Sequence, residues 1–410
     1  MTALDKARNP GTQVIMLVLN DVTHDSRVRR EASTLAQAGY GVRVIGTHAA
    51  GSPLPDTESH RGWTLHRFRY GRTVTGLRRF WLLNLPRHLW QAIALIAFLR
   101  QQQAVIWHAH DYPALVLASL ALTGRRSPGK LIYDTHELYF HRFQPRTVPG
   151  RLLRRLNLWI ERILARRADA VLTVSPELAD FLAAQWHTFP PTVILNSAIS
   201  APPDLPSLPR PVDARLWLVH TGSLIARGRR LPDLLRGLAD TPADVHLTFL
   251  GEGPLQTHLQ ALAQALGIAQ RVHFVPPVPP EQVSAAIRSA DAAVIALDPT
   301  LPSYAFALPN KLFEAIAAGL PVLSTHTPAL SRFYAQHPIG VLWESRAPDD
   351  FARATATLAD PAARRQWQHA VQAAQNSIGW ETQAQRLLEQ YHAIMLLKPK
   401  TKEADRPATF

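Results

Sequence analysis

Runs of apolar residues alternate along the chain with segments in which apolar residues recur at helical spacing. In the first half the apolar runs are continuous, which predicts strands that are buried on both faces of a sheet. Residues 26–38 show the helical spacing and are followed by Gly39, a residue suited to a helix end. Strands separated by helices predict a parallel, doubly wound sheet. The predicted strands are 13–19, 42–45, 105–108, 131–134, 171–174 and 193–196.

A second unit of the same kind follows a stretch, 201–212, that is too rich in proline for regular structure. We therefore expect two Rossmann-like α/β domains, at 1–200 and 213–375, joined by this linker and facing a cleft, because ligands of such sheets bind outside the carboxyl ends of the strands. A final helix is expected at 376–397, and a disordered tail at 398–410. The strands predicted in the second domain are 216–219, 246–250, 272–275, 293–297, 322–324 and 341–342.

The composition is that of a globular protein, with 47% hydrophobic and 18% charged residues among 410. The sequence contains no cysteine, which excludes disulfides, thiolate catalysis and cysteine-ligated zinc and fits a reducing compartment. The first eleven residues contain no apolar leader, and the longest apolar run, 92–99, is much shorter than a bilayer span. We expect a cytoplasmic protein, peripheral to the inner face of the membrane.

The formal net charge of +13 is concentrated in one part of the first half. Residues 61–170 contain 19 Lys and Arg against 5 Asp and Glu, and such a patch attracts anionic lipid, nucleic acid or phosphorylated substrates. Within it, 77–100 and 151–167 are basic and amphipathic. A helix that covers its own sheet needs an apolar face, and so does a helix that lies on a membrane. We expect an anionic membrane surface as a partner and no nucleic acid, because no recognisable nucleic-acid-binding module accompanies the charge.

The segment 308–323 (LPNKLFEAIAAGLPVL) is the most informative part of the chain. It predicts a turn, a short helix that begins near Pro309, a stop at Gly319 and then a buried strand. Helical spacing places Lys311 and Glu314 on one stripe beside small residues. The N–H groups of a helix start and a lysine can hold a phosphate, and a carboxylate can accept hydrogen bonds from hydroxyls. An ordinary strand-linking helix with a surface ion pair would show the same spacing.

Three further clusters carry candidate chemistry. After a predicted strand, Gly222 offers backbone N–H groups, and Arg227, where the next helix is expected to begin, offers a positive charge. This arrangement suits a diphosphate but also a simple turn with an exposed arginine. The segments His108-Ala109-His110-Asp111 and Asp134-Thr135-His136-Glu137 each include the end of a predicted strand. Such clusters are compatible with a metal site or with hydrogen bonds to sugar hydroxyls.

The segment 309–323 resembles the donor-site motif of glycosyltransferase family 4, whose members have the GT-B fold and use nucleotide sugars. Asp25-Ser26-Arg27-Val28, followed by Glu31 and Ala32, is similar to the opening loop of a bacterial branch of that family. The resemblance spans nearly the whole chain, and it implies that the final helix, 376–397, crosses back to the first domain. It implies a retaining transfer of a sugar from a UDP- or GDP-sugar to a glycan or lipid-linked acceptor, in bacterial surface polysaccharide or glycolipid assembly. It also implies that no cofactor is permanently bound and that no metal is essential.

The resemblance assigns roles residue by residue. Arg227 and Lys311 would stabilise the departing diphosphate, Glu314 would hold the ribose, and His136 would touch the donor sugar. The other expected donor-site residues are Gly222, Ser223, Val275, Asn310 and Leu312, and the expected acceptor-side residues are Asp25, Arg27, His110 and Asp111.

Two positions depart from the family pattern. Ser223 stands where the family has an arginine, and Phe306 stands where many members have the first of two glutamates, the second being Glu314. Because the missing carboxylate normally contacts hydroxyls of the donor sugar, the segment defines a nucleotide site better than a sugar site. A non-catalytic GT-B protein that docks on a membrane and, less favoured, a basic nucleic-acid-binding protein stay open as alternatives.

Overall fold

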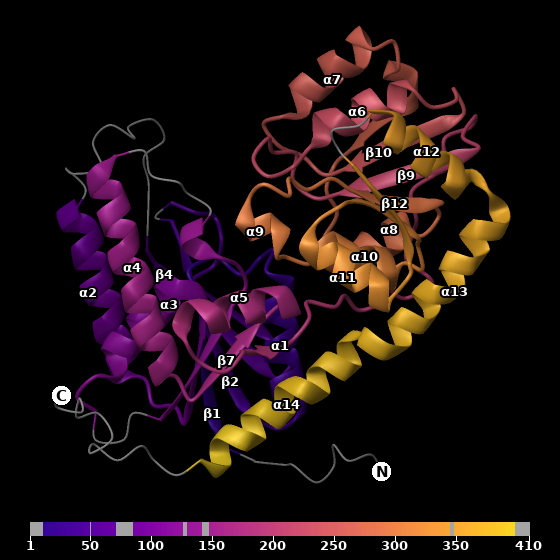
Figure 1. Ribbon diagram of the computed structural model, residues 1–410. Coiled ribbons are helices and arrows are strands. Elements are labelled where there is room, and N and C mark those ends of the chain that lie inside the picture. Colours follow the sequence, from indigo (N-terminus) through magenta and orange to yellow (C-terminus); the bar gives the residue numbers. More distant parts are fainter. Residues whose placement is uncertain are drawn as a thin grey trace, which may run out of the picture.

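The computed structural model describes residues 11–49, 51–70, 85–125, 129–141, 147–344 and 348–397. It shows two α/β domains, and a long helical segment runs from the second domain back to the first at the yellow end of the chain (Figure 1). The prediction of two parallel-sheet domains is confirmed. Part of the expected basic segment, 77–84, and the expected disordered tail, 398–410, lie outside the described residues.

The first domain contains an eight-stranded sheet. Its strands are β1 (Gln13–Leu17), β2 (Gly41–His48), β3 (Thr57–His60), β4 (Trp63–Arg69), β5 (Ile106–His110), β6 (Lys130–Thr135), β7 (Ala170–Thr173) and β8 (Thr192–Val193). They lie in the order β3-β4-β2-β1-β5-β6-β7-β8, and neighbours are parallel except for β3 and β4.

The edge formed by β3 and β4 corrects the sequence analysis, which expected a uniformly parallel sheet and predicted neither strand. Residues of β3 form no apolar run, and in β4 the buried Trp63 and Leu65 alternate with more exposed residues. Neither segment has the continuous apolar pattern of a central strand, because each lies near the edge of the sheet.

Helices cover both faces of this sheet. They are α1 (Ser26–Gln37), α2 (Leu85–Gln101), α3 (Asp111–Leu122), α4 (Val148–Arg167) and α5 (Pro176–Trp186), with a 3₁₀ turn, η3 (Tyr139–His141). The core under α2 to α5 includes Trp107 and Tyr133, and the core under α1 includes Met16 and Val44. The carboxyl ends of β1, β5 and β6 therefore meet at one edge of the domain, where the predicted acceptor-side residues lie.

The second domain contains a six-stranded parallel sheet with the order β11-β10-β9-β12-β13-β14. All six of its strands were predicted from the sequence. They are β9 (Leu216–Thr221), β10 (Val245–Leu250), β11 (Val272–Val275), β12 (Ala292–Ile295), β13 (Val322–Thr325) and β14 (Gly340–Trp343). The helices are α6 (Leu231–Ala239), α7 (Gln256–Ala265), α8 (Val283–Ile287), α9 (Pro302–Ala305), α10 (Asn310–Ala317), α11 (Pro328–Gln336), α12 (Pro348–Ala359) and α13 (Pro361–Ile378), with 3₁₀ turns η4 (Ala269–Arg271) and η5 (Pro280–Gln282).

The chain crosses between the domains twice, after β8 and again at Gly379. The last helix, α14 (Trp380–Leu396), leaves α13 at that glycine and packs along α1 of the first domain (Figure 1). It supplies Leu387, Tyr391 and Ile394 to the first domain's core. Both domains are thus tied together by a crossing that is itself part of a hydrophobic core.

Candidate functional site

The donor side of the site begins at α10, which starts directly after Pro309. Leu312 and Ile316 are buried in the core of the second domain, so they fix which way the opposite stripe of the helix faces. On that stripe, Nζ of Lys311 lies 3.0 Å from Nε2 of His220, and Glu314 accepts a hydrogen bond of 2.7 Å from the hydroxyl of Thr221. The stripe predicted from helical spacing therefore faces the end of β9 and not solvent.

Gly222 forms the turn after β9, with a φ of 97° that favours glycine. Its backbone is held close to the next loop, because a β-carbon on Gly251 would lie 2.3 Å from the carbonyl oxygen of Gly222. A β-carbon on Gly222 itself would lie 3.7 Å from Nη1 of Arg229 and 3.9 Å from Nζ of Lys311. Two cationic side chains thus converge in front of one glycine turn, and this arrangement suits an anion.

Arg229 and Arg227 have different environments in this loop. Arg229 donates a hydrogen bond to the carbonyl of Ser223, whereas Arg227 is exposed and its own carbonyl accepts a hydrogen bond of 3.3 Å from Tyr304. The sequence analysis placed a helix start at Arg227, but α6 begins only at Leu231, so that boundary was wrong. The extra turn gives Arg229 the reach to fill the space in front of Gly222.

Burial governs the charges on the donor side. Desolvation and the neighbouring Arg229 hold the pKa of Lys311 well below its usual value, and burial also lowers the pKa of Arg229. Burial raises the pKa of Glu314, although Thr221 and Lys311 oppose that shift. A bound diphosphate would place negative charge beside Lys311 and Arg229, and it would therefore raise the lowered pKa values of both side chains.

The other predicted donor-site residues occupy varied positions. The side chain of Leu312 is fully buried, so only its backbone is available to a ligand. The carbonyl of Val275 accepts a hydrogen bond of 2.9 Å from Gly251. Ser223 is exposed next to Gly222, and the side-chain oxygen of Asn310 accepts a hydrogen bond of 2.7 Å from Asn196 of the first domain. Asn310 therefore links the donor helix to the opposite side of the cleft.

The acceptor side is organised around Asp134, which is fully buried at the end of β6. Arg27 from α1 donates to it at 2.8 and 3.1 Å, and Nε2 of His136 lies 3.2 Å from the same carboxylate. Arg27 also lies 3.0 Å from Glu31, one turn along α1. The motif Asp25-x-Arg27-Val28-x-x-Glu31 thus supplies both a helix start and a buried ion-pair network.

The charges in this network stabilise each other. Although burial alone would raise it, the pKa of Asp134 lies well below its usual value because of Arg27, His136 and the hydrogen bonds that the carboxylate accepts. Burial opposes charge on His136 as well, yet Asp111 and Asp134 raise the pKa of His136 to about 10. At neutral pH His136 therefore favours its protonated form, which donates hydrogen bonds.

A possible metal-ligand set overlaps this network. Single ligand atoms of Glu31, His108, His110 and Asp134 lie within 4.8 Å of one another. The guanidinium of Arg27 lies between the two carboxylates, at the distances given above, and takes the place of a cation there. The arrangement therefore favours an internal ion pair over a metal site.

His110 and Asp111 support His136 and lie beneath it. His110 is 1% exposed, and its Nδ1 lies 3.2 Å from Nε2 of His136. Burial and the nearby His108 lower the pKa of His110 to about 3, so this ring is neutral. Asp111 accepts a hydrogen bond of 3.0 Å from the backbone N–H of His136, and its φ of 62° is unusual for a residue other than glycine. Their direct contact with an acceptor stays a prediction.

A cavity of 390 Å³ lies between the two sides. Of the predicted residues, it brings together Asp25, Arg27, His136 and Asn310. It does not include His110 or Asp111, and of the predicted donor-site residues only Asn310 lines it, so Lys311, Glu314 and the loop at Gly222 lie outside. Asp25 starts α1 by accepting a hydrogen bond from Val28, and the charge of His136 lowers the pKa of Asp25 against the effect of burial. The cavity is lined from both domains, which is the position expected for a sugar between donor and acceptor.

The segment around α9 closes this cavity from the second domain. Ser175 of the first domain donates a hydrogen bond of 2.5 Å to the carbonyl of Phe306, and the ring of Phe306 lies 5.1 Å from that of Phe181. Ala307 and Leu308 line the cavity, whereas Phe306 packs against the first domain's core. The side chain at the position of the missing glutamate is therefore directed into the interface between the domains.

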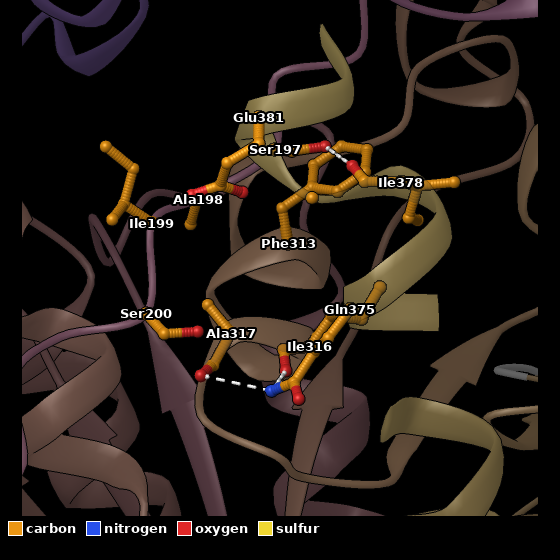
Figure 2. A pocket seen from close by; sticks show the side chains of 11 residues that line it. Ser197, Ala198, Ile199, Ser200, Phe313, Ile316, Ala317, Gln375, Ile378 and Glu381 are labelled. Carbon is orange, nitrogen blue, oxygen red and sulfur yellow. Dashed lines mark hydrogen bonds between the residues drawn. The ribbon is translucent and has the colours of Figure 1, made fainter. Parts of the chain in front are cut away.

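The two crossings meet at a small cavity of 120 Å³ behind α10 (Figure 2). Ser197 of the first crossing donates a hydrogen bond of 2.5 Å to the carbonyl of Ile378 in the second. The side-chain amide of Gln375 donates to the carbonyl of Ile316 at 2.5 Å, near the end of the donor helix. A movement of the chain at either crossing would therefore be transmitted to α10, which carries Lys311 and Glu314.

Several site residues were missed by the sequence analysis. His220 lies inside an apolar strand, Arg229 follows the family's basic position by two residues, and Asn196 ends the last strand predicted in the first domain. Their partners lie between 6 and 114 positions away. Only the surplus of arginines after Gly222 gave a local signal, so most of these contacts are products of the fold.

Comparison with known proteins agrees with this architecture. The model of Glycosyltransferase Family 4 matches residues 26–197, and the model of Glycosyl transferases group 1 matches residues 215–360. D-inositol 3-phosphate glycosyltransferase from Arthrobacter sp. (strain FB24) is 32% identical over 181 residues, which are 43% of this chain and 39% of that protein. The chain thus spans about two fifths of the length of this curated relative.

Solved structures show the same fold over nearly the full chain. Sucrose-phosphate synthase from Thermosynechococcus elongatus has a TM-score of 0.70 at 19% identity, with 94% of this chain and 99% of that chain covered. Anabaena HepE in complex with UDP and glucose has a TM-score of 0.67 at 16% identity, with 93% and 100% covered. The fold is therefore that of the GT-B glycosyltransferases. Each half of the chain matches a glycosyltransferase family model, and the predicted linker lies between the two matched segments.

Proposed function

We propose that this protein is a retaining glycosyltransferase that moves a sugar from a UDP- or GDP-sugar to a glycan or lipid-linked acceptor. The observation that carries the proposal is the convergence of Lys311 and Arg229 in front of Gly222. Lys311 lies on α10, whose first residue, Asn310, lines the cavity that contains His136. Two cations at a glycine turn suit a leaving diphosphate, whose charge develops in the transition state. The UDP-bound HepE structure and the glycosyltransferase relatives support a nucleotide sugar as the donor.

The roles proposed for single residues follow the geometry. Lys311 and Arg229 stabilise the diphosphate, and Arg227 adds charge at the exposed rim of the loop. Glu314, held by Thr221, accepts hydrogen bonds from the ribose hydroxyls. His136 donates a hydrogen bond to the sugar near its reactive carbon, which fits a transfer assisted by the donor phosphate and not by an enzymic base. Retention of configuration is then the expected outcome.

The test is turnover of a panel of UDP- and GDP-sugars by the purified chain, with release of the nucleotide as the readout and the anomeric configuration of any product read by NMR. Lys311→Ala should lower donor turnover by about 100-fold or more, because a preorganised charge at the leaving group is lost. No binding or turnover of any donor would support the non-catalytic GT-B alternative. Salt-sensitive binding of nucleic acid without donor binding would support the third candidate.

We also propose that the first domain docks on an anionic membrane, where a lipid-linked acceptor in surface polysaccharide or glycolipid assembly would be presented. Among the described residues, no helix combines the length and the apolar character needed to cross a bilayer. The apolar face of α4 is turned outward: Leu152 is 67% exposed and Trp159 is 58% exposed. Trp90 of α2 is 69% exposed, and both helices pack on α3 at the outer side of the domain (Figure 1).

The apolar face of α4 points outward among arginines and is not buried by the domain itself. It therefore suits contact with a membrane surface better than a role in covering the sheet. Flotation with liposomes tests this part of the proposal. The protein should float with anionic vesicles at low salt and much less with neutral ones, and Leu152→Ser with Trp159→Ser should abolish flotation while donor turnover in solution persists. Equal flotation of this double variant would count against the docking face.

A further inference from the structure

His220 lies at the end of β9, directly beneath the donor-side cluster. It is fully buried, and its ring lies edge-on to Phe249 of the neighbouring β10, with the ring centroids 5.7 Å apart. A buried histidine inside an apolar strand is often only a packing residue. Here both ring nitrogens have polar partners, and one of these is the lysine on which the donor site depends.

The hydrogen bonds determine where the proton of His220 lies. Nδ1 is 2.9 Å from the carbonyl oxygen of Val294 in β12, and because a carbonyl only accepts, Nδ1 must carry the hydrogen. Nε2 of the neutral ring is then bare and accepts a hydrogen bond from Nζ of Lys311, at 3.0 Å. The backbone of one strand thus orients the ring, and the ring in turn orients the lysine.

A neutral acceptor has a particular advantage at this position. A carboxylate in the same place would hold Lys311 as firmly, but it would also neutralise the charge that a diphosphate needs. An imidazole holds the amino group with one hydrogen bond and leaves the positive charge and the remaining N–H donors available. Lys311 can therefore be fixed in direction without being paired in charge.

We propose that His220 is a positioning residue of the donor site: its bare Nε2 holds the amino group of Lys311 in front of Gly222, ready for the diphosphate of the nucleotide sugar. This inference rests on the proposed glycosyltransferase function and adds a residue to its donor side. It accounts for both hydrogen bonds of the buried ring and for the convergence of Lys311 with Arg229.

The charged groups around the pair support this role. Arg229 faces it from the loop after β9, and Glu314 faces it from α10. Burial, together with Lys311 and Arg229, holds the pKa of His220 well below its usual value, so the ring stays a neutral acceptor at working pH. Because burial and Arg229 also lower the pKa of Lys311, binding of a diphosphate should favour protonation of the lysine.

Three substitutions separate positioning from packing. His220→Gln can present an acceptor oxygen near the position of Nε2, whereas His220→Asn reaches only as far as Nδ1 and keeps the contact with Val294. His220→Phe keeps the ring and loses both hydrogen bonds. His246→Gln, at another buried histidine of the same domain that contacts His273, serves as the matched control.

The experiment measures binding of UDP and of GDP to the full chain by calorimetry, together with the melting temperature of each variant. We expect affinity for the bound nucleotide within about threefold of the parent for His220→Gln, and about tenfold weaker or worse for the Asn and Phe variants. The control should bind like the parent. A pure packing role predicts the reverse order, with Phe the best replacement, and that result would overturn the inference.

The pH dependence of nucleotide binding is a second measurement, and a change in packing alone would not alter it. Loss of the acceptor makes the ammonium form of Lys311 less stable, so the pH above which nucleotide binding weakens should fall in the Asn and Phe variants and change little in the Gln variant. If the Phe variant does not fold, the comparison of Gln with Asn decides the question. A parent protein that binds neither nucleotide would overturn the proposed function, whereas a parent that binds and a series without differences would overturn only the role of His220.

Discussion

The two sides of the cleft handle charge in opposite ways. On the first domain, the cations Arg27 and His136 lie among the carboxylates of Asp134, Glu31 and Asp111. On the second domain, Lys311 and Arg229 converge in front of Gly222, and the carboxylate of Glu314 acts on both. The first side is balanced internally, whereas the second has two basic side chains against one carboxylate.

This difference shows how one cleft can receive two kinds of ligand. A balanced network offers directed hydrogen bonds to neutral hydroxyls without attracting an anion, whereas uncompensated cations in a desolvated place attract one strongly. An anionic donor is thereby directed to the second domain and a hydroxyl-bearing sugar toward His136.

Removing the central carboxylate should damage the first side most. Asp134→Ala leaves Arg27 and His136 buried without their shared partner, so the free energy of unfolding should fall by about 3–5 kcal/mol. Chemical denaturation at pH 7 measures this loss. Asp180→Ala, which removes a largely exposed partner of Arg332, is the control and should cost less than about 1 kcal/mol. A similar loss for both variants would show that the network is not the stabilising element.

The charge on His136 should make the stability of the first domain depend on pH. Its pKa is about 10 in the folded protein against an ordinary 6.5, so its contribution is fully present below pH 6.5 and is lost as the pH rises toward 10. Between pH 7 and 9.5 the free energy of unfolding should fall by something on the order of a few kcal/mol. His136→Gln should flatten this slope, and an unchanged slope in that variant would contradict the assignment of the proton.

The second side should respond in activity and not in stability. Arg229→Ala should reduce donor kcat/KM by about 100-fold, because Arg229 lies with Lys311 at Gly222. Arg227→Ala, two positions away and exposed, should reduce it by less than about tenfold. Initial rates with the best donor of the panel measure both. The opposite order would return the diphosphate role to Arg227, as the sequence motif alone suggested.

We expect the smallest change in activity from substitutions of Phe306, which lies at the interface between the two domains. Because the ring of Phe306 faces Phe181 and not the cavity, Phe306→Glu should leave the order of preferred donor sugars unchanged. It should lower the free energy of unfolding by about 1–3 kcal/mol, because the aromatic pair is lost and a carboxylate replaces a ring that packs on the core. Phe306→Leu should keep the preference and most of the stability. A donor range that changes only in the Glu variant would show that a side chain at this position reaches the sugar.

The sequence predicted the fold well where local patterns suffice. Every strand of the second sheet was predicted, and so were the donor helix with Lys311 and Glu314 on one stripe and the final helix on the first domain. These elements follow from apolar runs, from helical spacing and from the family motif. The antiparallel edge of the first sheet was missed because Thr57–His60 is polar and short.

The site was harder to predict because its contacts join distant segments. His220 is paired with a lysine 91 positions away, and Arg229 reaches Gly222 only because α6 begins later than its pattern suggested. The outward face of α4 could not be read from amphipathicity, since a buried and an exposed apolar stripe have the same period. Sequence thus indicated which residues carry charge, and the fold determined which charges face each other.

The position of α14 has a consequence for the synthesis of the protein. The core of the first domain contains Leu387, Tyr391 and Ile394, although its last strand ends at Val193. A ribosome must therefore add roughly 200 further residues before that core can be completed, which takes about 10 to 40 s at ordinary rates of translation. During this interval the first domain exposes the apolar groove that α14 will fill. Until the final helix has left the ribosome, the nascent chain therefore exposes apolar surface of the kind that chaperones bind.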